Sequence, residues 1–135
     1  FGHPVGMMRS LLPLICLVLA ACDAPTPGFR GAEVSRHVVD GSAFTVHVKG
    51  DTAEAVRTNR QYAPRIGPLA GRAAVAMQAA SGCRVTRIGG DAAVLVAKLS
   101  CGKDRVRACD VDATLVGPRG YRAPVVRACA ATARG

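Results

Sequence analysis

The chain has 135 residues, which is room for one domain, and half of them are hydrophobic, which excludes a disordered chain. Its 18 basic residues outnumber nine acidic ones, so the net charge is +9. Three Phe, two Tyr and no Trp leave few side chains for stacking on bases. We therefore expect an aliphatic core and no nucleic-acid ligand.

The first segment has the layout of a secretory signal peptide. Arg9 and Ser10 follow two Met residues, and an unbroken apolar run then extends over 11–21 and ends in small residues. This run is shorter than the ~20 residues that a membrane-spanning helix needs. We expect residues 1–21 to be removed, with 1–6 lying upstream of the signal itself.

The end of this run, Leu19-Ala20-Ala21-Cys22, resembles the lipobox of bacterial lipoproteins at all four positions. The resemblance implies cleavage before Cys22, acyl chains such as palmitate on its thiol, and a membrane anchor that holds the chain in the periplasm. Asp23 resembles the inner-membrane retention signal of enterobacterial lipoproteins. The alternatives are an ordinary secretory signal that happens to end in Cys, or a short buried helix. The rest of the chain resembles short envelope lipoproteins without assigned function, which names no activity.

Cleavage at this point leaves 114 residues, with 17 basic and nine acidic ones and a net charge of +8. Residues 22–35 contain Pro25, Pro27, Gly28 and Gly31 and little apolar pattern, so we expect a lipidated Cys followed by a tether. Residues 36–135 are expected to form a single domain.

Turn signals and alternating apolar residues predict strands in the first half of this domain. Asp40-Gly41 is a two-residue hairpin signal that follows Val38 and Val39. The segment 42–49 alternates, with Phe44, Val46 and Val48 on one face. Gly50-Asp51 predicts another turn, and 52–58 a weaker third strand.

The segment at about 64–81 is the only good helix candidate. Pro64 and Pro68 suit a first helical turn, and Gly82 suits the position after the last one. Apolar residues at helical spacing form one Ala-rich stripe, made of Leu69, Ala73, Ala76, Met77 and Ala80. This stripe predicts a helix packed on a sheet.

Two further hairpins follow. The segment 83–88 alternates, Gly89-Gly90-Asp91 breaks the pattern, and 93–99 resumes it. The segments 110–116 and 121–126 flank Gly117–Gly120, where Pro118 fits the first corner of a type I turn and Gly120 a left-handed position. Pro124 restricts the last strand to an edge. The predicted fold class is α+β, an antiparallel sheet of hairpin-connected strands with one packed helix.

Four cysteines remain for the domain once Cys16 leaves with the signal and Cys22 carries lipid. Residues equidistant from a hairpin turn face each other, and the two predicted turns lie midway between Cys83 and Cys101 and between Cys109 and Cys129. We therefore predict the disulfides 83–101 and 109–129. A zinc site is the rival interpretation, but no Cys-x-x-Cys pair supports it.

Catalytic patterns are weak. The Asp40-Gly41 hairpin places His37 opposite Phe44 and His47 on the other face, so we expect two separate surface or sheet-edge histidines. Asp110 and Asp112 have no identifiable carboxylate partner, and Ser35, Ser42, Ser81 and Ser100 lack a nucleophile-elbow context. We expect no cofactor, no metal and no enzyme, with a small hydrolase as a remote alternative.

Two basic clusters are the remaining functional hint. Arg57, Arg60 and Arg65 surround Asn59, Gln61 and Tyr62, and Lys103, Arg105 and Arg107 alternate, which would give an extended segment one basic edge. The leading hypothesis is a non-enzymatic accessory module that binds an envelope protein or polymer. The alternative is a polyanion binder that contacts anionic lipid, lipopolysaccharide or a wall polymer through these clusters. Arginines that merely keep the protein soluble explain the same pattern.

Overall fold

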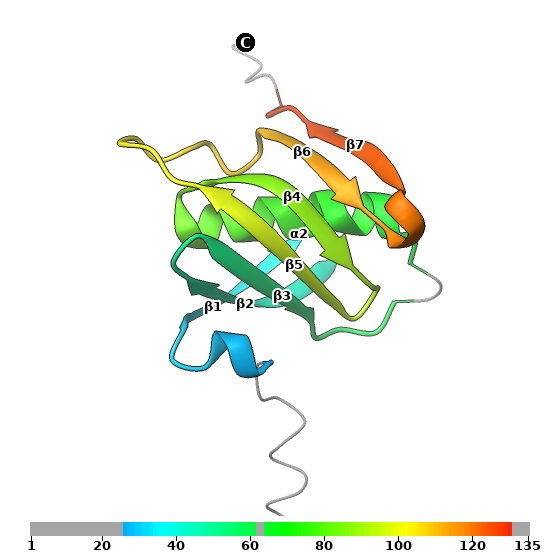
Figure 1. The fold of residues 1–135 in the computed structure, drawn as a ribbon, viewed down its shortest axis with the longest axis horizontal. Helices are drawn as coiled ribbons and strands as arrows, with labels where there is room; N and C mark the ends of the chain where they lie inside the picture. The colour runs from blue at the N-terminus through cyan, green and yellow to red at the C-terminus, as the bar shows by residue number, and fades with distance from the viewer. Residues whose placement is uncertain (1–25, 62–63, 131–135) are drawn as a thin grey trace, which may run out of the picture. The chain divides into compact units, whose positions relative to one another are not determined.

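The computed structural model describes residues 26–61 and 64–130 (Figure 1). The predicted signal peptide, Cys22 and Asp23 lie outside the described residues. A short 3-10 turn, η2 (Pro27–Phe29), belongs to the first of two units, and Gly31–Gly135 form the second, the domain. In the described part of the chain, no helix is long and apolar enough to cross a bilayer.

The domain is an α+β fold, as predicted, with one helix and a seven-stranded sheet. The first strands are β1 (Glu33–Val39), β2 (Ser42–Lys49) and β3 (Thr52–Arg57), and the helix α2 (Ile66–Ser81) follows. The second half contains β4 (Arg84–Gly90), β5 (Val94–Ser100), β6 (Val111–Val116), the 3-10 turn η3 (Pro118–Gly120) and β7 (Arg122–Arg127). Because β1 begins at Glu33, the sheet starts inside the segment assigned to the tether.

The strand order is β1-β2-β3-β5-β4-β6-β7. Asp40-Gly41 closes the first hairpin in the predicted register, with Val39 opposite Ser42 and His37 opposite Phe44. The sheet is antiparallel, as predicted, except between β4 and β6, which run parallel. The long loop between β5 and β6 makes the crossover that a parallel pair requires. Pro124 lies in β7, an edge strand, as expected.

Two turns differ in detail from the predictions. Gly89 and Gly90 remain in β4, and the chain turns at 91–93, where the Asp91 carboxylate accepts hydrogen bonds from the N–H groups of Ala93 and Val94. These bonds hold the pKa of Asp91 below its usual value. Arg119 has φ 59°, which a type I turn does not allow, while Gly120 has the predicted positive φ.

The sheet wraps around α2, which runs behind β4 in Figure 1 and packs against all seven strands. Ala70, Ala73, Ala74 and Ala76 are fully buried, and in the helix only Ile66, Gly67 and Pro68 are exposed. Small side chains let the strand faces approach the helix axis closely. The Ala-rich stripe therefore becomes one part of an almost completely enclosed helix.

An ion pair joins opposite ends of the strand order. Arg127, at the end of β7, donates a hydrogen bond of 2.7 Å to the carboxylate of Asp40 in the β1–β2 turn. The Arg127 side chain crosses the helix at Gly71, where an added Cβ would lie 3.3 Å from Arg127 Cδ. The two ends of the sheet can meet in this way only because the sheet curls around the helix.

A bulge in β4 sets the register of the second hairpin. Near the turn Gly90 faces Leu95, and this register would place Cys83 opposite Gly102. The ladder shifts by one residue between Val85 and Arg87, so Arg84 faces Ser100. This shift brings Cys83 opposite Cys101, to which it is bonded. The same shift lets Val85 and Ile88, three residues apart, both point into the core.

Both predicted disulfides are present. Cys83 and Cys101 are bonded with a Cα–Cα distance of 4.5 Å, and Cys109 and Cys129 with 4.8 Å. The register of β6 and β7 carries straight through to the second pair, whereas the first pair depends on the bulge. Cys109, Asp110 and Cys129 lie within 4.8 Å of one another, but sulfurs bonded to each other are not thiolate ligands, so the zinc interpretation is wrong.

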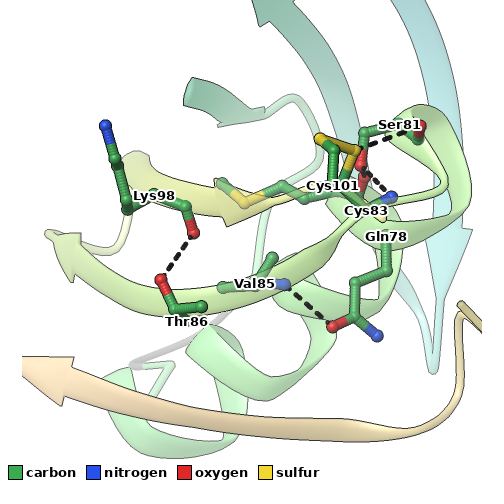
Figure 2. The surroundings of a disulfide bond; sticks show 8 residues. Gln78, Ser81, Cys83, Val85, Thr86, Lys98 and Cys101 are labelled. Atoms are coloured by element: carbon green, nitrogen blue, oxygen red, sulfur yellow. Dashed lines mark hydrogen bonds between the residues drawn. A yellow bond between two sulfur atoms is a disulfide. The ribbon is translucent and has the colours of Figure 1, made fainter. Parts of the chain in front are cut away.

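Gln78 connects α2 to β4 and to the loop that leads into β6. Its side chain is fully buried, and its Oε1 accepts a hydrogen bond of 3.0 Å from Val85 N, beside the Cys83–Cys101 bridge (Figure 2). Its Nε2 donates to the carbonyls of Ala108, at 3.1 Å, and Asp110, at 2.6 Å. The predicted apolar stripe did not include this residue, although it lies next to Met77.

Replacing Gln78 by Met should lower the free energy of unfolding by about 2–4 kcal/mol, because buried main-chain groups lose their partners. Urea denaturation, with both disulfides intact, measures this loss. The control is Ser81→Ala on the same helix, which removes a half-buried hydroxyl that donates to Met77 O and accepts from Cys83 N, and it should cost only about 1 kcal/mol because both hydrogen bonds are only partly buried. Equal effects of the two substitutions would show that Gln78 has no special role.

Candidate anion-binding face

The face of the sheet that points away from α2 carries the clearest grouping of charge. We name two sets of residues on it, each defined by strand register. The basic row crosses five strands as Lys49, Thr52, Lys98, Arg87 and Thr114. The apolar row lies two residues along each strand and consists of Val96, Gly89 and Val116, and past Val96 the same line continues to the enclosed Glu54 and His47.

Two cations of the basic row face each other directly. Arg87 and Lys98 are cross-strand partners in β4 and β5, and both are exposed. Like charges in this position destabilise a sheet. Lys98 also bonds to Asp51, and this hydrogen bond, together with the ammonium charge, lowers the pKa of that carboxyl. Asp51 thus offsets one of the two facing charges and reduces the repulsion between Arg87 and Lys98.

A hollow of about 280 Å³ lies beside these cations. Gly89, Val96 and Val116 line it together with Arg87 and Lys98. Val96 is 42% exposed, which is high for a valine in an inner strand. Close packing also requires glycine at position 89, because a Cβ there would lie 2.7 Å from the carbonyl oxygen of Val116.

The bulge is responsible for the position of Arg87. It turns Thr86 and Arg87 outward together and holds Thr86 by a 3.3 Å hydrogen bond from its hydroxyl to Lys98 O (Figure 2). Strict alternation from Val85 would have pointed Arg87 into the core. For this reason the sequence pattern alone did not mark Arg87 and Lys98 as neighbours.

The structure does not bring the predicted cluster of Arg57, Arg60 and Arg65 together as a ligand site. Arg57 is half-buried, and its guanidinium donates to the carbonyls of Ala92, at 2.7 Å, and Asn59, at 2.9 Å. Arg60 and Arg65 are exposed. Arg57 thus holds the chain after β3 against the turn after β4, and it is not available as a ligand.

The polar neighbours of this cluster also fasten the chain. Asn59 accepts a hydrogen bond from Ala43 N and donates one to Gly41 O. The buried Ser42 hydroxyl donates to Gln61 at 2.9 Å and accepts from Arg72 at 3.2 Å. These contacts tie the segment before α2 to the first hairpin. Tyr62 lies outside the described residues.

The second predicted cluster is not an extended edge. Lys103, Arg105 and Arg107 are exposed, but they lie in the irregular loop between β5 and β6. Arg105 donates a 3.1 Å hydrogen bond to Ala79 O and packs over Gly82, which ends the helix at φ 72°. A cation at this end of α2 complements the helix dipole, so Arg105 acts as a helix cap.

The histidines stay apart, as predicted, but His47 is not at the surface. His37 lies on the edge strand β1, and its Nε2 is 2.8 Å from the hydroxyl of Ser35. His47 is buried, with its Nδ1 3.6 Å from Oε1 of Glu54, its partner on β3. Both side chains are enclosed, at 5% and 0% exposure, so a substrate does not reach this histidine and carboxylate.

No protein-family model matches the chain, and neither a curated protein nor a solved structure matches it significantly.

Substituting Arg57 by Gln should lower the free energy of unfolding by about 1–3 kcal/mol, because two half-buried carbonyls lose a charged donor. Thermal or urea unfolding measures the effect. Arg60→Gln, which removes the same charge from an exposed side chain, should stay within ~0.5 kcal/mol of the parent. If Arg60→Gln destabilised the domain more than Arg57→Gln, Arg57 would again be a candidate ligand-binding residue.

Proposed function

We propose that the chain is a lipid-anchored envelope protein whose domain binds an anionic partner and catalyses no reaction. The lipobox at Cys22 supports the anchor. Two disulfides support an oxidising compartment, and they use the four cysteines of the domain, leaving Cys22 for lipid. Acyl chains on one Cys make anchoring stable, since each buried CH₂ contributes ~0.8 kcal/mol.

The observation that carries the binding function is the basic row beside the hollow. A sheet face with facing cations and an adjoining apolar strip suits a ligand that presents phosphates next to hydrocarbon. Anionic lipid is such a ligand, and it is abundant where a lipid anchor would hold the domain. Binding to an envelope protein remains the second candidate, and the enclosed His47 and Glu54 give no support to a hydrolase.

The anchor is tested by Cys22→Ser, which should move the protein from the detergent phase of a membrane extract to the soluble fraction. Mass spectrometry of the exported protein should find acyl chains on Cys22 in the parent only. Cys16→Ser, inside the signal, is the matched control and should leave the protein membrane-bound. Retention of the Cys22→Ser protein on the membrane would refute lipid anchoring.

The face is tested by two double variants that each remove two positive charges. Arg87→Gln with Lys98→Gln should weaken binding to phosphatidylglycerol vesicles by roughly 30-fold at about 0.15 M salt, since each basic residue near the surface contributes ~1 kcal/mol. Arg60→Gln with Arg65→Gln should change it little. Both are made in the Cys22→Ser chain and measured by vesicle sedimentation, with phosphatidylcholine vesicles as the uncharged reference. Equal losses in both would mean that only net charge matters.

A further inference from the structure

The open edge of β1 differs from the other edge of the sheet. β7 carries Pro124 at its centre, which removes a main-chain donor, and it ends in the Arg127–Asp40 ion pair. β1 has neither a proline nor a lysine over its seven residues. Val34 and Val38 on this strand are 60% and 75% exposed. Within residues 26–61 and 64–130 no strand pairs with this edge, and an edge strand of this kind is a template for pairing with another strand.

The first hairpin determines which groups β1 offers. A two-residue turn closes on a hydrogen-bonded pair, here Val39 and Ser42, and hydrogen-bonded pairs then alternate along the ladder. The N–H and C=O groups of every second residue from Val39 therefore point to β2. Those of Val34, Arg36 and Val38 point to the open edge.

We propose that β1 pairs antiparallel with β1 of a second copy of this chain, so that the two sheets continue into one. The side chains select the register. If Arg36 faced Arg36 of the second copy, two like charges would lie directly opposite. If Ser35 faces Ser35, Glu33 lies opposite His37 of the second copy at both ends, and Val34 exchanges main-chain hydrogen bonds with Arg36.

The dimer is weak and reversible. Seven residues a side are fewer than the about 20–30 that each partner contributes to a standard interface, and two positively charged domains repel each other. Salt screens this repulsion and strengthens the dimer, whereas it weakens binding of anionic vesicles. Pairing through β1 leaves the basic row and the hollow uncovered, and it does not depend on the proposed anchor.

Cysteine crosslinking tests the register in the Cys22→Ser chain. Ser35→Cys should form a disulfide-linked dimer under mild oxidation, because residues in a non-hydrogen-bonded pair bring their Cβ atoms within ~5.5 Å. Arg36→Cys should do so much more slowly. Peptide mapping verifies that the pairs 83–101 and 109–129 are retained. Faster crosslinking at position 36, or equal rates at both, would overturn the Ser35 register.

Sedimentation velocity tests pairing without a new thiol. Arg36→Pro removes an N–H that points to the open edge, so the β1–β2 ladder remains and the domain folds, which circular dichroism verifies. This variant should weaken the dimer by about tenfold or more, while Arg36→Thr, which keeps the N–H, should not. A parent chain that stays monomeric at high concentration and salt, or a dimer unaffected by Arg36→Pro, would overturn the proposal.

Discussion

The enclosure of one small-residue helix by a curled sheet is the constraint on which the rest of this domain depends. Four alanines of α2 are fully buried, and Gly71 lies beneath the side chain of Arg127. A bulkier residue at these positions would push strands away from the helix and open the sheet. The curl in turn lets the β1–β2 turn reach the end of β7, where Asp40 and Arg127 form their ion pair. The close approach of the strands to α2 and the Asp40–Arg127 ion pair thus result from the same packing arrangement.

Polar anchors hold the irregular segments to this core. Gln78 satisfies main-chain groups of β4 and of the loop before β6, and Arg57 does the same for the segment after β3. Arg105 caps the end of α2. Arg57 and Arg105, two of the six basic residues singled out from the sequence, therefore stabilise the fold itself. Net charge gives no means of separating such residues from those that can bind a ligand.

The helix occupies one face of the sheet, which leaves the other face and the edge strands for contacts made by the sheet itself. On the outer face, register brings Arg87 and Lys98 together beside the hollow over Gly89. At the edge, β1 offers main-chain groups and two exposed valines. The two surfaces respond in opposite directions to salt, because the first attracts anions and the second must overcome repulsion between like-charged domains. Ionic strength therefore separates their contributions in solution.

The sequence by itself determined the local features: the Asp40-Gly41 hairpin, the helix with Gly82 at its end, the edge position of Pro124, and both disulfides. Each depends on residues close in the chain, where turn chemistry and periodicity act directly. The parallel pairing of β4 and β6 and the contact of Arg57 with Ala92 depended on residues far apart in the chain. His47 and Glu54 face each other across one hairpin, but their burial was also decided by the tertiary structure, because strand alternation does not tell whether a polar face is covered. The bulge at Thr86 lies between these cases, because it is local but breaks the alternation from which a strand is recognised. Only the tertiary structure decided which arginines bind the protein's own carbonyls and which face solvent, since a guanidinium's partners are set by packing and not by its neighbours in sequence.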